Sequence, residues 1–326
     1  MSIPKLKVGV IGLGRMGKRH AINLLHKVPR AELICACTPL EVDIAWANEN
    51  LVPHGVQVVS TFEEMIEVPG LEAVIIASAT PFHASQTSIC LERGIHVLCE
   101  KPICKTIEEV TGETGLTSSD VSKSDIDGCE PLDMSPFYQQ YLADSGGIFI
   151  DTIIHDIDLS LFFFGEDSIP KSVSAMGTSA HHQQLEAIGD ADNAVGICEY
   201  WDGKIAFFYN SRTSAHGYDN ATEIFGTAGK LSINLQPRIN AVEICDRDGF
   251  VKTPVHPGWY DRYAEAFVTE ATAWVDAVLD EAPMPHPLVS TLKSLGIAMA
   301  LQESLRTGQK VFFDQSGVRV SESQSL

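Results

Sequence analysis

The sequence predicts an α/β fold, with an N-terminal Rossmann domain built on a doubly wound parallel sheet and a C-terminal α+β domain with an open antiparallel sheet. Three observations predict it. The 326 residues exceed what one hydrophobic core usually organises. Short β-branched runs alternate with amphipathic stretches over the first hundred residues, whereas strand patterns with short connections fill the second half. We therefore divide the chain into domains at 1–125 and 126–326.

The N-terminal domain is predicted to contain four buried strands separated by helices. The strands are expected at residues 7–11, 32–37, 73–77 and 96–99, and the helices at 16–27, 42–51, 62–67 and 84–93. Right-handed crossovers between such strands place them in one parallel sheet.

Residues 111–145 break this pattern, since they carry seven acidic residues against one lysine and few apolar ones. We expect this atypical acidic segment to be a loop or disordered. A loop of that length is uncommon inside a compact domain, so it is functional, mobile or a sign that a segment is missing.

The C-terminal domain is predicted from strands with short turns between them, which require antiparallel pairing. The strands are expected at residues 173–178, 194–200, 204–210, 222–225, 230–234 and 241–245, followed by helices at 261–279 and 289–306. Pro283, Pro285 and Pro287 separate the two helices.

The composition limits the kinds of molecule that the protein is expected to bind. With 23 basic and 43 acidic residues the net charge is −20, which would repel a phosphate backbone, so we expect no nucleic acid partner. No apolar run reaches membrane length, so we expect no membrane partner. The eight cysteines are scattered without a CxxC pair, which favours reduced thiols in the cytoplasm, and we predict no metal site.

The most specific motif is the glycine-rich turn directly after the first predicted strand. Gly12 permits a tight turn, Gly14 lets a pyrophosphate approach the backbone, and Gly17 lets the following helix pack closely. The free N–H groups at the start of that helix favour an anion. The turn predicts a dinucleotide site formed by Gly12, Leu13, Gly14, Arg15, Met16 and Gly17.

The choice between NAD and NADP remains open in the sequence. A carboxylate at the end of the second strand would bind the ribose hydroxyls of NAD, but Thr38 stands there, and it can donate to a hydroxyl or to a 2′-phosphate. Glu41 is the nearest following acid, and no arginine stands beside Thr38. We favour NAD slightly.

Two further places carry candidate catalytic residues. Lys101 follows a buried strand at the ligand-binding edge of the sheet, although spacing alone favours a surface lysine. Asp151 and His155 stand four residues apart on a predicted helix, which would let the carboxylate orient the imidazole for proton transfer. A structural His–Asp pair explains the same spacing equally well.

Four motifs in fixed order resemble the glucose-fructose oxidoreductase/inositol dehydrogenase (Gfo/Idh/MocA) oxidoreductases. They are VGVIGLGRMGKRHA, HVLCEKP, SGGIFIDTIIHDIDL and GYDNATEIFGTAGKL. The resemblance implies a Rossmann domain joined to an open-faced sheet that mediates oligomerisation, and hence a homodimer or homotetramer.

The resemblance also implies roles for single residues. Lys101, Asp151 and His155 would flank the reacting carbon of a sugar, inositol or related cyclic diol. His155 would take the hydroxyl proton, Asp151 would orient it, and Lys101 would polarise the oxygen while hydride leaves for the nicotinamide. Ser78, Thr80, His83, Glu100 and Lys101 would line the cofactor.

One departure from the family pattern affects the expected function. Family members continue after the EKP motif with a helix and a strand that carries a G-F-x-R-R-F-D-like motif, and here the acidic segment replaces them. We therefore expect a missing edge strand and a missing substrate-contacting arginine. Two hypotheses follow: an NAD(P)-dependent dehydrogenase or reductase acting on CH–OH groups, or a non-catalytic NAD(P)-binding regulator or defective shortened member.

Overall fold

The computed structural model describes residues 4–104, 121–123, 141–142, 145–213, 217–233, 239, 244–245, 247, 251–252, 255–256, 258–284 and 288–324. The chain divides into two compact units. The first unit comprises Met1–Asp125 and Glu265–Gly296, and the second comprises Ile126–Ala264 and Ile297–Leu326. Residues 265–296, which the sequence assigned to the C-terminal domain, therefore belong to the first unit.

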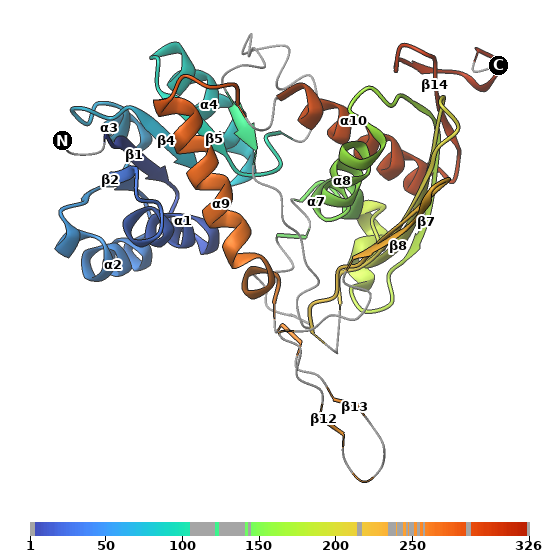
Figure 1. Ribbon diagram of the computed structural model, residues 1–326, viewed down its shortest axis with the longest axis horizontal. Helices are drawn as coiled ribbons and strands as arrows, with labels where there is room; N and C mark the ends of the chain where they lie inside the picture. Colours follow the sequence, from blue (N-terminus) through green and yellow to red (C-terminus); the bar gives the residue numbers. More distant parts are fainter. Residues whose placement is uncertain are drawn as a thin grey trace. The chain divides into compact units, whose positions relative to one another are not determined.

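The first unit contains a six-stranded parallel sheet in the order β3-β2-β1-β4-β5-β6 (Figure 1). Its strands are β1 (Leu6–Ile11), β2 (Ala31–Cys37), β3 (Gln57–Val59), β4 (Ala73–Ile76), β5 (His96–Cys99) and β6 (Val121–Lys123). The strand order reverses between β1 and β4, where ligands of doubly wound sheets bind. This confirms the predicted Rossmann sheet.

Helices connect these strands, close to the predicted ranges. They are α1 (Arg15–His26), α2 (Glu41–Asn50), α3 (Phe62–Ile66) and α4 (His83–Glu92), with short 3-10 turns at Val52–His54 and Thr80–Phe82. The residues at the start of α3 explain why this helix begins at Phe62. The Thr61 side chain accepts from the Glu64 N–H while the Glu64 carboxylate accepts from the Thr61 N–H, a capping box.

Strand β6 overturns the expectation of a missing edge strand. Val121–Lys123 lies within the acidic segment and pairs in parallel with β5, Val97 opposite Val121 and Cys99 opposite Lys123. Three residues suffice because an unpaired edge of β5 offers its N–H and C=O groups to any extended segment. The sequence interpretation weighed the composition of the whole segment, most of which lies outside the described residues, and so missed this strand.

The core of the first unit explains why the segment 265–296 belongs to it. Helix α9 (Trp259–Leu279) contributes the fully buried Trp274 and Val275 to the cluster that contains β1 and α1. Arg30, after α1, donates to both Asp276 and Asp280. Apolar burial is the main stabilising term here, and the exposed ion pairs add little.

The second unit contains a five-stranded antiparallel sheet in the order β15-β14-β7-β8-β9. Its strands are β7 (Pro170–Thr178), β8 (Asn193–Tyr200), β9 (Ile205–Ser211), β14 (Val311–Phe313) and β15 (Arg319–Val320). The predicted antiparallel sheet is confirmed, although β14 and β15 were not predicted.

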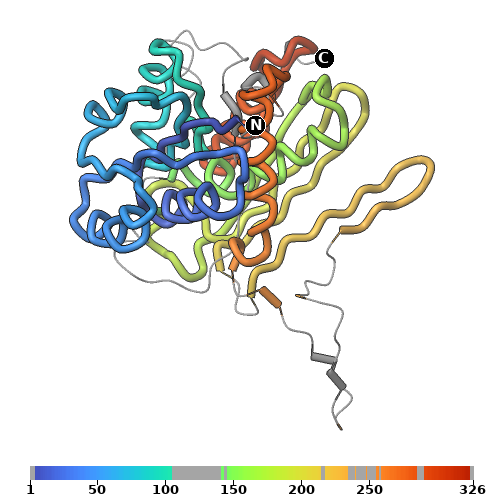
Figure 2. The backbone as a smooth tube through the Cα atoms, turned by 60° about the vertical axis from the view of Figure 1, so that its left-hand side comes forward, coloured from blue at the N-terminus to red at the C-terminus, as the bar shows by residue number. Residues whose placement is uncertain are grey.

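Three strands that the sequence assigned to this sheet, those at 222–225, 230–234 and 241–245, pair outside it. Strands β10 (Thr222–Gly226) and β11 (Gly229–Ile233) pair only with each other, as do β12 (Ile244–Cys245) and β13 (Val251–Lys252), within the described residues. Figure 2 shows the β10–β11 hairpin as a separate golden arm. Short turns predicted antiparallel pairing correctly, but they do not say which sheet a hairpin joins.

Alternating side chains give strands β7, β8 and β9 one buried and one exposed face. Phe208 on β9 is buried, whereas its neighbours point the other way. The opposite face, which we call the exposed sheet face, carries five large apolar side chains: Met176, Ile197, Ile205, Phe207 and Tyr209. Cross-strand register sets Ile197 beside Phe207.

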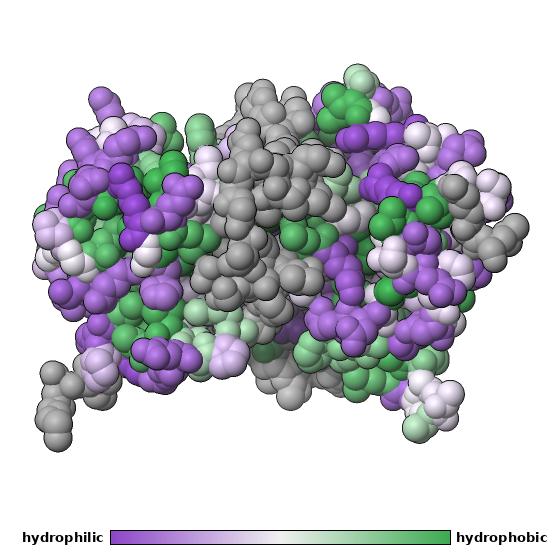
Figure 3. Space-filling model, turned by 90° about the horizontal axis from the view of Figure 1, so that it is seen from above, coloured by the Kyte–Doolittle hydropathy of each residue, from purple (hydrophilic) through white to green (hydrophobic). Residues whose placement is uncertain are grey.

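Hydrophilic and hydrophobic side chains are interspersed over the face drawn in Figure 3. Of the helices in the described part of the chain, none combines the length and the apolar character needed to cross a membrane.

Candidate active site

The glycine turn after β1 has the steric features of a dinucleotide loop. Gly12 has φ +85°, and a Cβ there would lie 2.6 Å from the Ala77 carbonyl oxygen. A Cβ on Gly17 would lie 1.7 Å from the Gly12 carbonyl oxygen, so both positions require glycine. At Gly14, by contrast, a Cβ would meet no atom within 4 Å. The backbone at Gly14 is therefore open to a ligand.

The start of α1 also suits an anionic group. Gly14 is the N-cap and supplies no side-chain cap, and the first turn holds no acidic residue. Its N–H groups and the positive end of the helix dipole favour a phosphate. Of the predicted loop residues, Leu13 has a fully buried side chain, so only its backbone can face a ligand, whereas Arg15 is exposed.

The end of β2, where an adenosine ribose would be recognised, holds few charges. Thr38 is buried, and its hydroxyl oxygen lies 3.4 Å from the Leu40 amide nitrogen, which donates to it. Asp43, in the first turn of α2, forms a 2.6 Å ion pair with Lys18 of α1. Sequence reasoning did not single out this pair, in which Lys18 neutralises the Asp43 carboxylate.

Glu100 and Lys101 follow β5 at the carboxyl edge of the sheet. Glu100 Oε1 lies 2.7 Å from His20 Nε2, and Glu100 Oε2 accepts from the Lys101 N–H at 3.3 Å. Burial alone would raise the pKa of Glu100, but the His20 bond and nearby positive charges outweigh it and lower the pKa. Glu100 is thus an ionised carboxylate held by α1, and it anchors the turn that carries Lys101.

Ser78, Thr80 and His83 follow β4 and lie at the same edge as the turn after β5. The Ser78 hydroxyl donates to Gln86 at 2.7 Å. The His83 ring is buried and lies 2.9 Å from two carbonyl oxygens, those of Ser78 and Pro102. The structure therefore brings together the predicted residues of the loop after β4 and of the turn after β5.

Asp151 and His155 do not lie on one continuous helix, contrary to the prediction. Helix α7 (Ile148–Asp151) ends before α8 (Ile154–Phe164) begins. The Thr152 hydroxyl donates to the Ile148 carbonyl oxygen at 2.6 Å, and such side-chain bonds compete with helical ones. The i to i+4 argument for a shared helix face does not apply across this break.

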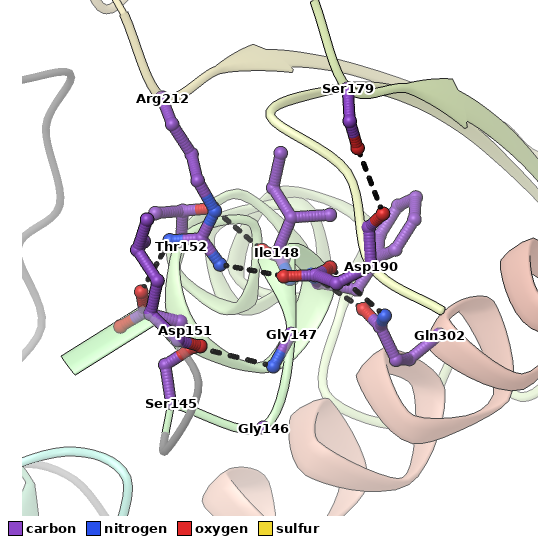
Figure 4. A network of polar contacts seen from close by, with 12 residues as sticks. Ser145, Gly146, Gly147, Ile148, Asp151, Thr152, Ser179, Asp190, Arg212 and Gln302 are labelled. Atoms are coloured by element: carbon purple, nitrogen blue, oxygen red, sulfur yellow. Dashed lines mark hydrogen bonds and ion pairs between the residues drawn. The ribbon is translucent and has the colours of Figure 1, made fainter. Parts of the chain in front are cut away.

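Asp151 is instead held by an arginine that sequence reasoning missed. Arg212, at the end of β9, places Nη1 2.7 Å from one Asp151 oxygen, while the Tyr141 hydroxyl donates to the other at 2.5 Å. Arg212 Nη2 lies 3.4 Å from Asp190 (Figure 4). Burial opposes the guanidinium charge, but the two carboxylates outweigh it and raise the pKa of Arg212.

Asp190 links this cluster to the backbone of α7. One Asp190 oxygen accepts from the Ile148 N–H at 2.9 Å and from the Gln302 amide at 3.1 Å (Figure 4). Gln302, on α10 (Leu288–Thr307), accepts from the Phe149 N–H at 3.1 Å. The two N–H groups at the start of α7 are thus satisfied by side chains.

Gly147 explains the paired glycines of the SGGIFID motif. Its φ is +113°, and a Cβ there would lie 2.3–2.5 Å from the side-chain atoms of Gln302. The glycine pair was the available sequence signal that another element packs closely here. Arg212 had no comparable signal, since Asn-Ser-Arg-Thr after a strand is unremarkable as a sequence.

The comparisons with known proteins agree with this architecture. Residues 6–112 match the oxidoreductase family with an NAD-binding Rossmann fold, and residues 123–232 match the GFO/IDH/MocA C-terminal domain. The scyllo-inositol 2-dehydrogenase (NAD(+)) of Bacillus subtilis (strain 168) is 30% identical over 95% of this chain and 97% of its own.

Two solved structures are similar over nearly their whole length. The myo-inositol 2-dehydrogenase from Lactobacillus plantarum matches with a TM-score of 0.85 at 27% identity, covering 95% of this chain and 100% of that one. The scyllo-inositol dehydrogenase from Lactobacillus casei, with bound NAD(H) and scyllo-inositol, matches with a TM-score of 0.83 at 28% identity, covering 94% and 99%. The resemblance inferred from the motifs is confirmed, and the chain belongs to the GFO/IDH/MocA family of NAD-binding oxidoreductases.

Proposed function

We propose that the protein is an NAD-dependent dehydrogenase that oxidises a secondary alcohol on a cyclic polyol of the inositol class. The observation that carries the proposal is the open backbone at Gly14, at a helix start without a side-chain cap. Lys101 follows β5 at the carboxyl edge of the same sheet. The inositol dehydrogenases quoted above support the substrate class, since each aligns with nearly the whole chain.

The cofactor would be held by the loop 12–17 and by the residues after β4 and β5. When bound, the nicotinamide supplies the hydride acceptor. Oxidation of a CH–OH group releases one hydride to the cofactor and one proton to a base, leaving a ketone. We assign the proton to His155 and polarisation of the alcohol oxygen to Lys101.

Asp151 has a different role in this proposal from the one suggested by helix spacing. Its carboxylate is buried and paired with Arg212 at 2.7 Å, which favours the ionised form. An ionised carboxylate can hold a neighbouring cation or imidazolium in place without itself exchanging a proton. We therefore assign Asp151 an orienting role.

A shortened, non-catalytic protein is the weaker alternative. It was based on a missing edge strand and a missing substrate-contacting arginine, and β6 occupies that edge of the sheet. The alignment with the Bacillus relative spans 97% of that protein's length, so the similarity is not confined to one of the two domains. Lys101, Asp151 and His155 are all retained, and a sensor has no chemical need of them.

NAD is favoured over NADP by the residues after β2. Thr38 is buried, no arginine occurs among residues 38–43, and the nearby Lys18 is paired with Asp43. A 2′-phosphate would find no cation committed to it at this strand end. Titration with NADH and NADPH tests this directly, and tighter binding of NADPH would refute it.

The exposed sheet face supports a homodimer or homotetramer. Phe207, Tyr209 and Met176 are 65%, 67% and 69% exposed, respectively, and contiguous apolar patches of this kind mark interfaces. A Phe207→Glu variant should lower the molar mass measured by light scattering to that of the monomer. An unchanged oligomer, or a monomeric wild type at micromolar concentration, would refute this arrangement.

A cytoplasmic location is supported by the cysteines. The described cysteines Cys35, Cys37, Cys90, Cys99, Cys104 and Cys198 are buried free thiols. Thiols persist in a reducing compartment.

The experiment that tests the function follows nicotinamide absorbance with NAD or NADP and a panel of inositols, aldoses and cyclic diols. We expect reduction of NAD by at least one inositol. Lys101→Met and His155→Ala should each abolish turnover while NADH still binds with nearly unchanged affinity. Full turnover in both variants would refute the assigned residues, and silence of the wild type across the panel, with NADH bound, would favour a regulator.

A further inference from the structure

His83 makes two hydrogen bonds that together define its charge. Its Nδ1 lies 2.9 Å from the Pro102 carbonyl oxygen, and its Nε2 lies 2.9 Å from the Ser78 carbonyl oxygen. A carbonyl oxygen only accepts hydrogen bonds, whereas a neutral imidazole has one donor nitrogen and one acceptor nitrogen. Both bonds can form only if both ring nitrogens carry a proton, so the ring is an imidazolium.

The surroundings of the ring support that charge. The titratable groups that face His83 are the Cys99 thiol and the Glu100 carboxylate, both at the end of β5, and Glu100 is itself paired with His20 of α1. Burial by itself would lower the pKa of His83. The interactions with Cys99 and with the two carbonyl oxygens outweigh burial and raise the pKa to about 9.

The two carbonyl groups belong to the two walls of the predicted dinucleotide site. The Ser78 backbone packs on the glycine turn, since a Cβ on Gly12 would lie 2.7 Å from Ser78 N and Cα. Pro102 directly follows Lys101. A shift at Ser78 therefore reaches the phosphate loop, and a shift at Pro102 reaches Lys101.

We infer that His83 is a buried imidazolium that fastens the loop after β4 to the Lys101–Pro102 turn, so that loss of its proton loosens the cofactor site. This makes His83 a positioning residue and not a group that contacts the dinucleotide through its ring. Above the pKa, one nitrogen turns a lone pair toward a carbonyl oxygen, and the two repel. The inference rests on the proposed function only in that the site binds a nicotinamide dinucleotide.

Nuclear magnetic resonance of the wild-type protein tests the protonation state without any variant. With 15N-labelled histidine, the His83 ring should show a hydrogen on both nitrogens at neutral pH and lose one only near pH 9. The resonance is assigned by its disappearance in His83→Gln. A neutral His83 ring at pH 7 would overturn the inference.

Binding of NADH, followed by fluorescence from pH 6.5 to pH 10, tests the consequence. In the wild type, Kd should stay level to about pH 8 and then rise by about tenfold in total as His83 loses its proton and one of its two hydrogen bonds. His83→Gln, which donates from a single nitrogen, should bind about tenfold more weakly at pH 7, the loss of one hydrogen bond, with no inflection near pH 9.

Two further variants serve as controls. His96→Gln, at an exposed histidine at the start of β5, should reproduce the wild-type profile. Cys99→Ser should keep the inflection, although its midpoint can shift because the thiol faces the ring. If the inflection in the plot of Kd against pH survives in His83→Gln but disappears in Cys99→Ser, the inference is overturned. A wild-type Kd that stays level to pH 10 would also overturn it. Wild-type protein that fails to bind NADH at pH 7 contradicts the proposed function instead.

Discussion

Replacing Arg212 with methionine should destabilise the protein by an amount that can be worked out from the burial and ion pairs of this residue. Arg212, Asp151 and Asp190 are all at least 94% buried, and the guanidinium serves both carboxylates. Arg212→Met keeps much of the apolar stem but leaves two carboxylates without their shared cation. Removing one partner of a buried ion pair costs about 3–5 kcal/mol, which corresponds to a fall in Tm of about 10 °C for a unit of this size.

The loss should depend on pH in a definite direction. Without Arg212, two buried carboxylates lack their shared cation, so uptake of a proton by this cluster relieves the penalty. The Tm difference between wild type and Arg212→Met is therefore largest near neutral pH and narrows as the pH falls toward about 5. Thermal unfolding followed by circular dichroism at several pH values measures this difference.

Arg30→Met is a matched control, because Arg30 also pairs with two aspartates. Those pairs, with Asp276 and Asp280, lie at the surface and are screened by solvent, so their loss should change the Tm little. Arg212→Lys keeps the positive charge but not the two Nη groups that reach separate carboxylates. Its Tm should fall between those of the wild type and Arg212→Met. Equal Tm values for Arg212→Met and Arg30→Met would refute the reasoning.

Three other substitutions test separate parts of the account. Gly147→Ala should lower stability by at least about 1–3 kcal/mol, since alanine is strained at φ +113° and its Cβ would overlap Gln302, and chemical denaturation measures this; an unchanged midpoint would contradict the packing argument. Trp274→Ala should cost about 3–5 kcal/mol by opening a cavity in the core of the first unit, and a loss under 1 kcal/mol would mean that α9 is not part of that core. His20→Leu removes the partner that keeps the Glu100 pKa below its ordinary value of 4.5. That stabilisation is present above pH 4.5 and disappears as the pH falls, so wild type and variant should differ in stability at pH 7 and converge in acid; a pH-independent difference would refute it.

The strongly periodic parts of the fold could be predicted from the sequence. Strands β1, β2, β4 and β5 are mostly buried apolar runs, and helical patterns separate them. The strands that were missed, β3, β6, β13, β14 and β15, are two or three residues long. Such segments carry no periodicity and become strands only because a neighbouring edge pairs with them.

The residues of the candidate site also fall into those that the sequence could predict and those that it could not. The glycine turn was predictable because its constraints are local: φ at Gly12, and the close approach of Gly12 to Gly17. The partner of Asp151 was not, because Arg212 stands 61 residues further along the chain and only the fold brings the two together. The break between α7 and α8 was not predictable either, because the periodicity of apolar residues does not show where a helix is interrupted.

The most direct test of the proposed activity is the transfer of hydrogen from the substrate carbon to the nicotinamide. An inositol carrying deuterium on its ring carbons is incubated with the enzyme and NAD, and the dinucleotide product is analysed by mass spectrometry. We predict reduced cofactor that carries one deuterium, formed more slowly than with unlabelled substrate. Reduced cofactor without deuterium, or none despite bound NAD, would contradict the proposal that this chain removes hydride from a secondary alcohol.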